Sequence, residues 1–142
     1  MSDLRAGVHG EPALSARLEP WMVDLLADPA RCAGLLQRYG SPVNVIDPAP
    51  LRRNADELVE AGSRAGVQVE LFFARKANKA LSLVDEMLSS GHGVDVASEP
   101  ELRQVLQRGA PGERIILTAA VKPEPLLRLA LQHGVTISLD SL

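Results

Sequence analysis

The sequence predicts an α/β fold in which parallel strands alternate with helices. Four apolar segments have strand character, and they begin near Val69, Val94, Arg114 and Val135. Their starts are separated by 25, 20 and 21 residues, and each intervening segment has helical periodicity and ends at a glycine. A unit of this length carries the chain back to the same end of the sheet, so we expect consecutive strands to be parallel.

The first 40 residues are expected to form a helical extension before this repeat. Residues 20–27 predict a short helix with Trp21 on its apolar side. Residues 29–39 predict a second helix, because Pro29 suits the first helical position and Gly40 provides a stop.

Residues 41–47 (Ser-Pro-Val-Asn-Val-Ile-Asp) alternate between polar and apolar side chains, which predicts a short strand. Pro42 restricts this strand to the start or the edge of a sheet, because proline cannot donate a ladder hydrogen bond. Asp47 is a candidate N-cap for the next helix, which is expected over residues 51–65 and ends at Gly66.

The repeat predicts strands at 69–74, 94–97, 114–119 and 135–140, and helices at 79–90, 99–107 and 123–132. Such a sheet can close in two ways, as an open doubly wound sheet or as an eight-stranded barrel. No glycine-rich phosphate-binding motif follows the first strand, which argues against a dinucleotide site. Four strand–helix units correspond to half of a barrel.

Composition and charge exclude several classes of partner. The net charge is -3, the pI is about 5.6 and aromatic residues make up 3%, which argues against nucleic acid and anionic membranes. No apolar run reaches the roughly 18 residues of a membrane span. Cys32 is the single cysteine and no signal peptide is visible, so we expect a cytoplasmic protein. The three histidines are scattered, and no metal site is expected.

The candidate catalytic residue is Lys76, at the end of the first strand of the repeat. Side chains alternate along a strand, so Lys76 shares a face with Ala74, whereas Arg75 points to the other face. The small Ala74 leaves room beside the amine, and an apolar floor there would favour the neutral amine that attacks an aldehyde. A Schiff-base lysine is therefore one interpretation, and an exposed lysine that caps the strand is the alternative.

Two motifs resemble a known family. Residues 73–78 (Phe-Ala-Arg-Lys-Ala-Asn) resemble the Tyr-Ala-Val-Lys-Ala-Asn motif of the fold-type III pyridoxal-phosphate enzymes, and in particular of the ornithine/diaminopimelate/arginine decarboxylases. Residues 93–102 (Gly-Val-Asp-Val-Ala-Ser-Glu-Pro-Glu-Leu) resemble the second barrel strand of that family and the helix start after it. Asp95 follows Lys76 by 19 residues, as in the family. The resemblance covers residues 41–142.

This resemblance implies an alanine-racemase-like barrel of the (β/α)8 TIM type, of which the chain would form the N-terminal half. Residues 1–40 would be the helical extension. Residues 41–47 would contribute a strand to a second, β domain, and residues 48–142 would form a partial barrel that binds pyridoxal phosphate.

The implied cofactor is pyridoxal 5′-phosphate, which Lys76 would hold as an imine. Asp95 would balance the positive charge of the lysine or the imine, and Ser98 and Glu101 would lie near the cofactor. Ser98 and Glu101 also have the spacing of a capping box, so local structure alone explains both residues.

The implied reaction is the decarboxylation of an amino acid, and the implied assembly is a homodimer. In the family, the phosphate-binding glycines, the carboxylate that pairs with the pyridine nitrogen and the second domain come later in the chain. The sequence therefore looks like an incomplete N-terminal part. It does not name the amino acid, and the activity of these 142 residues alone is an open question.

Three residues depart from the family pattern, and they indicate a divergent branch. Phe73 replaces a tyrosine, Arg75 replaces an apolar residue, and Lys79 stands where proline is common. Two other interpretations remain open. The protein could be an amino-acid racemase of the same fold, although residues 95–101 favour the decarboxylases, or a non-catalytic decarboxylase-like protein that binds a partner.

Overall fold

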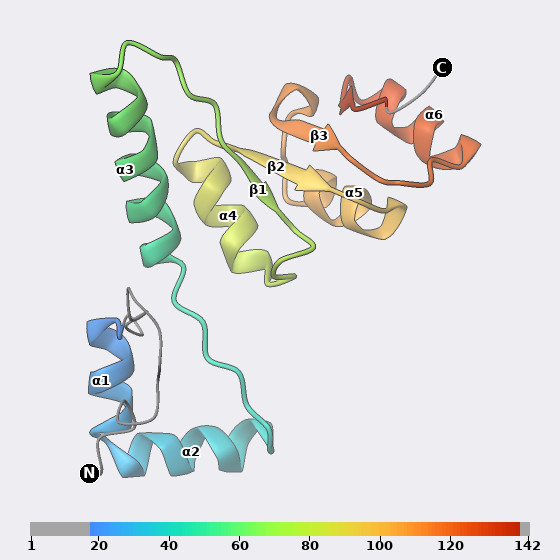
Figure 1. Cartoon of the computed structure of the whole chain (residues 1–142). Helices are drawn as coiled ribbons and strands as arrows, with labels where there is room; N and C mark the ends of the chain where they lie inside the picture. The colour runs from blue at the N-terminus through green and yellow to red at the C-terminus, as the bar shows by residue number, and fades with distance from the viewer. Residues whose placement is uncertain (1–17, 140–142) are drawn as a thin grey trace, which may run out of the picture. The chain divides into compact units, whose positions relative to one another are not determined.

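A computed structural model describes residues 18–139 and divides the chain into two compact units. The first unit extends to Val45 and contains two helices, whereas the second begins at Ile46 and contains the sheet (Figure 1). Within the described residues, no helix is long and apolar enough to cross a membrane.

The first unit consists of α1 (Pro20–Leu26) and α2 (Pro29–Tyr39). Helix α2 has the predicted bounds, and its N-cap is Asp28, whose side chain accepts a hydrogen bond from the backbone N–H of Arg31 at 2.9 Å. Gly40 ends α2 with φ of 82°, in the region that favours glycine.

The second unit begins with a helix and then alternates strands with helices. Its elements are α3 (Ala49–Arg64), β1 (Phe72–Ala74), α4 (Leu81–Ser89), β2 (Gly93–Val96), α5 (Glu99–Gln107), a 3₁₀ turn (Gly112–Arg114), β3 (Ile115–Leu117), α6 (Glu124–Gln132) and β4 (Thr136–Ile137). The order of elements and the bounds of α5 agree with the prediction.

The four strands form one parallel sheet in the order β1-β2-β3-β4. Phe73 in β1 pairs with Val94 in β2, and Val94 pairs with Ile115 in β3. This sequential order is the order of a barrel, whereas a doubly wound sheet reverses its strand order at a switch point.

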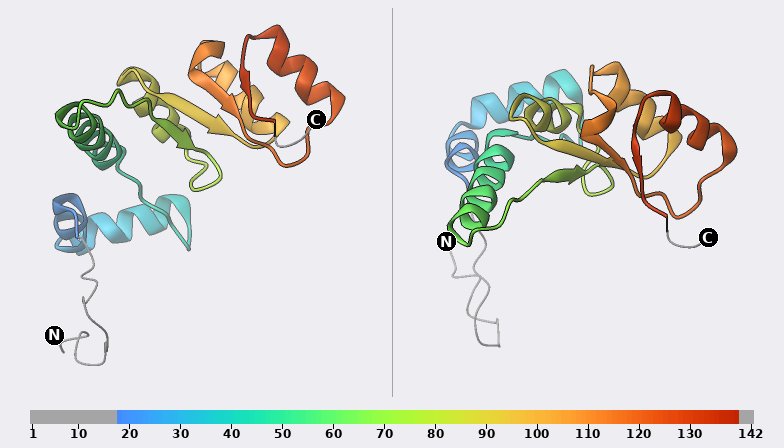
Figure 2. Two further views of the ribbon diagram at one scale, coloured as in Figure 1. Left: turned by 45° about the horizontal axis from the view of Figure 1, so that its top comes forward. Right: turned by 90° about the horizontal axis from the view of Figure 1, so that it is seen from above.

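Helices α4, α5 and α6 cover one face of the sheet (Figure 2). The core lies between them and the strands, and it contains fully buried side chains from β2, β3 and the helices. These are Val84, Val94, Val96, Leu102, Val105, Ile115, Leu117, Leu126 and Ala130. The alternate side chains of β2 and β3 therefore point away from the helices, to the face that would line a barrel.

Some predicted elements differ from those observed. The strands are shorter than expected because a strand extends only as far as its neighbours pair with it, and β4 retains only Thr136 and Ile137. Residues 41–47 are not a strand in the structure, since no strand of the described residues pairs with them. Their contribution to a second domain stays a prediction. Asp140, the expected end of the last strand, lies outside the described residues.

Gly112 lies where the start of β3 approaches the end of α6. A Cβ atom added at Gly112 would overlap the backbone carbonyl group of His133. This close approach requires a residue without a side chain, because the obstacle is backbone and cannot rotate away.

We expect Gly112→Ala to lower the free energy of unfolding by about 1–3 kcal/mol, because the backbone must move to admit the methyl group. Urea unfolding followed by circular dichroism measures the change. Gln132→Ala on exposed α6 surface is the control and should change the free energy of unfolding by less than about 0.5 kcal/mol. Equal stability of Gly112→Ala and the unmodified chain would contradict the prediction.

Candidate active site

The candidate site lies at the edge of the sheet where β1, β2 and β3 end. The strands are parallel, so their carboxyl ends meet at this edge. Ala74 in β1 is in register with Asp95 in β2, and Asp95 is in register with Ile116 in β3. These three residues share the face turned away from the core helices, because Val94 and Val96 on either side of Asp95 are buried in the core.

Lys76 lies in a tight turn directly after β1. The backbone N–H of Ala77 donates to the carbonyl oxygen of Ala74 at 3.0 Å, which closes the turn. The side chain of Lys76 is exposed, and its amine has no hydrogen-bond partner among residues 18–139. The expected desolvation of this amine is therefore not provided by the described residues, but the amine is open to a small molecule.

Thr118, a residue that no sequence motif marks, holds Asp95 in place. Oδ1 of Asp95 accepts a hydrogen bond from the hydroxyl of Thr118 at 2.6 Å. Thr118 follows β3 and lies two residues after Ile116, so the same alternation that places Asp95 on this face also places Thr118 there. The half-buried Asp95 carboxylate is thus oriented on the face that carries Ala74.

The start of α5 contains both other predicted site residues. Ser98 is the N-cap, and its side chain accepts a hydrogen bond from the backbone N–H of Glu101. Oε2 of Glu101 accepts from the backbone N–H of Ala97 at 2.8 Å, one residue earlier than the ordinary capping box requires. The predicted capping role is therefore observed in a shifted form.

Glu101 is buried, with 4% of its surface exposed, and its second oxygen forms an ion pair. Nζ of Lys79 lies 2.5 Å from Oε1 of Glu101. Burial alone would raise the pKa of Glu101, but the bonds from Lys79 and the Ala97 amide, together with the charges of Lys79 and Arg75, outweigh it and lower the pKa. The carboxylate is therefore ionised at neutral pH.

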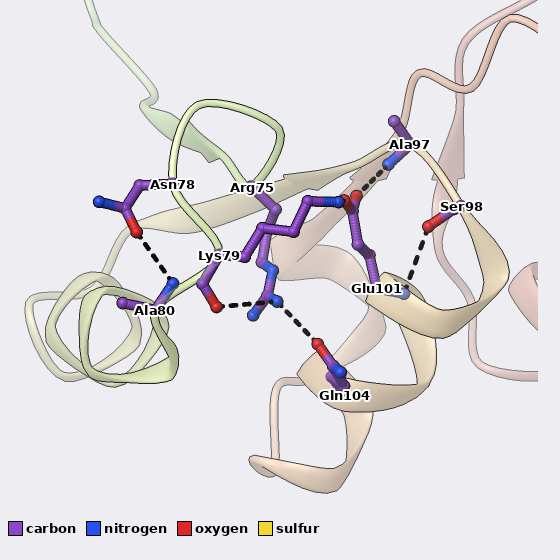
Figure 3. A network of polar contacts seen from close by, with 8 residues as sticks. All are labelled: Arg75, Asn78, Lys79, Ala80, Ala97, Ser98, Glu101 and Gln104. Atoms are coloured by element: carbon purple, nitrogen blue, oxygen red, sulfur yellow. Dashed lines mark hydrogen bonds and ion pairs between the residues drawn. The ribbon is translucent and has the colours of Figure 1, made fainter. Parts of the chain in front are cut away.

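Arg75 occupies the opposite face from Ala74, as the alternation predicts. It is 1% exposed, and its Nη2 atom donates to Oε1 of Gln104 at 2.7 Å and to the carbonyl oxygen of Lys79 at 3.2 Å (Figure 3). Arg75 and Lys79 stand out in the sequence as departures from the family pattern, whereas no motif marks Gln104 as a partner of Arg75. Gln104 is three residues after Glu101 on α5, and that spacing is the signal that could have found it.

The arrangement of the described residues is suited to the attachment of an aldehyde cofactor to a lysine. Lys76 presents an open primary amine at the carboxyl ends of the strands, the end at which barrel enzymes place their sites. The small Ala74 and the oriented carboxylate of Asp95 lie on the neighbouring strand ends.

A protein-family model matches the part of the chain that contains the sheet. Residues 52–142 match the family model described as "Pyridoxal-dependent decarboxylase, pyridoxal binding domain". The chain belongs to this family. The resemblance inferred from residues 73–78 and 93–102 is therefore confirmed.

Curated relatives of the chain include two diaminopimelate decarboxylases. The one from Methanothermobacter thermautotrophicus is 33% identical over 117 residues, which are 82% of this chain and 27% of the relative. The one from Bacillus subtilis is 32% identical over 101 residues, which are 71% of this chain and 23% of the relative. The uncharacterized protein y4yA of Sinorhizobium fredii is 34% identical over 104 residues, 73% of this chain and 23% of the relative. The chain thus spans about a quarter of the length of these relatives.

The fold of the chain also matches solved structures. The lysine/ornithine decarboxylase of Vibrio vulnificus, solved in complex with putrescine, matches with a TM-score of 0.69 and 24% identity. The match covers 89% of this chain and 32% of that chain. The four-stranded sheet therefore corresponds to the N-terminal part of a TIM-type barrel, which confirms the predicted fold class.

The lowered pKa of Glu101 makes a stabilising contribution that depends on pH. A carboxylate with a lower pKa in the folded than in the unfolded state stabilises the fold fully above its unfolded pKa of about 4.3. The contribution is lost as the pH falls through the lower, folded pKa.

We expect Glu101→Gln to lower the free energy of unfolding by about 1–2 kcal/mol near neutral pH, since it removes the ionised partner of Lys79 and the Ala97 amide. This difference from the unmodified chain should be constant from pH 7 to about pH 5 and should shrink below about pH 4.3. Urea unfolding at several pH values measures it. Glu124→Gln, which removes an exposed carboxylate from α6, is the matched control. A difference that does not change with pH would contradict the prediction.

Proposed function

We propose that this chain is the part of a pyridoxal-phosphate-dependent amino-acid decarboxylase that supplies the Schiff-base lysine, Lys76. The observation that carries the proposal is the open amine of Lys76 at the carboxyl end of β1, in a chain that belongs to the pyridoxal-dependent decarboxylase family. Pyridoxal phosphate, when bound, supplies an electron sink for the electron pair that departing carbon dioxide leaves behind.

Lys76 and Asp95 have separate tasks in this proposal. Lys76 would hold the aldehyde of the cofactor through its amine, and a free Lys76 amine could hold or donate a proton. Asp95 places a negative charge at the same edge of the sheet. This charge could balance the positive charge of Lys76 or of its imine with the cofactor. Thr118 occupies Oδ1 of Asp95, and Oδ2 accepts no hydrogen bond from the described residues, so Oδ2 is available to that positive charge.

Ser98 and Glu101 border the proposed cofactor site at the end of β2. Both side chains already bond to the backbone of residues 97–101, and these bonds shape the turn between β2 and α5. We propose that they contribute to cofactor binding mainly by holding this turn in place.

The substrate proposed for the whole protein is an amino acid of the diaminopimelate or ornithine class. The named relatives support this class, because two are diaminopimelate decarboxylases and the solved structure is a lysine/ornithine decarboxylase. A homodimer and a cytoplasmic location remain predictions from the sequence. A decarboxylase releases carbon dioxide from the amino acid. A racemase inverts the configuration of the amino acid and releases no carbon dioxide, so carbon dioxide release distinguishes the two proposals.

The chain contains three lysines, Lys76, Lys79 and Lys122, so selective reaction at Lys76 can be measured directly. We expect incubation with pyridoxal phosphate, borohydride reduction and peptide mass analysis to place most of the label on Lys76. The amine of Lys76 is exposed and has no partner among the described residues, whereas Lys79 forms an ion pair with Glu101.

Lys76→Ala should abolish that label, and Lys122→Ala is the matched control that should leave it unchanged. An even distribution of label over the three lysines would contradict the proposal. It would instead favour a non-catalytic decarboxylase-like protein that binds a partner.

A further inference from the structure

We infer that Arg75 and Lys79 position Lys76 by clamping its turn onto α5, an inference that rests on the proposed role of Lys76. Both ends of the turn contact the same helix (Figure 3). Arg75 at the first end bonds to Gln104, and Lys79 at the other end bonds to Glu101. Glu101 and Gln104 are three residues apart and thus lie on one side of α5.

The same residues also brace the turn internally. Nη2 of Arg75 donates to the carbonyl oxygen of Lys79, which links the two ends of the turn across Lys76. The N–H of Ala77 bonds to the carbonyl oxygen of Ala74 inside the turn. The backbone of Lys76 therefore lies within a loop that is closed by side chains and anchored twice to α5.

Packing alone gives no reason for an arginine at position 75. The residue is 1% exposed, and its Nε and Nη1 atoms have no hydrogen-bond partner among the described residues. Buried donors without partners are unfavourable, and an apolar residue of similar volume generally packs as well as a buried charge. A role in holding the turn explains why this position carries a guanidinium.

The ion pair between Lys79 and Glu101 also connects the turn to the end of β2. Glu101 bonds simultaneously to Lys79 and to the backbone N–H of Ala97, two residues after Asp95. The position of the Lys76 turn is thereby coupled to the strand end that carries Asp95. The clamp sets where the amine of Lys76 lies relative to that carboxylate.

Arg75→Met separates positioning from stability. We expect this variant to keep the melting temperature of the unmodified chain, because methionine fills the buried space without unpaired donors. The Ala77 amide should exchange with solvent about tenfold faster, and the ratio of label on Lys76 to label on Lys122 should fall about fivefold, as expected for the loss of a hydrogen bond from a charged group. Hydrogen exchange needs no cofactor, and reductive labelling with pyridoxal phosphate measures the second effect.

A second variant keeps the inference testable if Arg75→Met does not fold. Gln104→Ala changes an exposed side chain and removes the same hydrogen bond, so it should shift both measurements in the same direction. The double variant should behave like Arg75→Met alone, because Arg75→Met already removes the hydrogen bond to Gln104 in addition to the one to the Lys79 carbonyl. Gln107→Ala, the same change on the exposed surface of α5, is the matched control and should shift neither measurement.

The outcomes distinguish this inference from the proposed function. Unchanged exchange at Ala77 in both variants would overturn the clamp, whatever happens to the label. If the unmodified chain places no excess label on Lys76, the proposed function fails, and the exchange of Ala77 alone then decides whether Arg75 holds the turn.

Discussion

The parallel pairing of β2 on both of its edges is the constraint on which the candidate site depends. It aligns the ends of three strands, so that Ala74, Asp95 and the segment leading to Thr118 meet at one edge. The burial of Val94 and Val96 against the helices decides which face of β2 is packed. Because side chains alternate, that same burial turns Asp95 to the opposite face.

Helix α5 provides a second constraint, and Glu101 is the residue that joins it to the site. One carboxylate oxygen bonds to the end of β2 and the other to the turn after β1. A buried carboxylate is stable only when its hydrogen bonds compensate for lost hydration, which the lowered pKa of Glu101 reflects. The Lys76 turn and the Asp95 strand end are thus held by one ionised group.

Under the proposed function, the described residues would form one side of a larger site. They supply an open amine, an oriented carboxylate and a braced turn, and the chain spans about a quarter of its curated relatives. Lys76 is exposed at the carboxyl end of β1 in this four-stranded sheet. Under the proposed function, Lys76 would hold the cofactor, and other residues would complete the site.

The sequence by itself determined the order of strands and helices in the second unit, the ends of α2 and α5, and the position of Lys76 just after the first strand of the repeat. These features depend on local periodicity, capping residues and spacing, which a sequence displays directly. The lengths predicted for the strands were too great, because the length of a strand depends on pairing with its neighbours. Only the tertiary structure decided the partners of the charged groups. Thr118 meets Asp95, Gln104 meets Arg75 and Glu101 meets Lys79 across 23, 29 and 22 residues of sequence. Strand register and helix packing bring these pairs together, and neither can be read from local sequence.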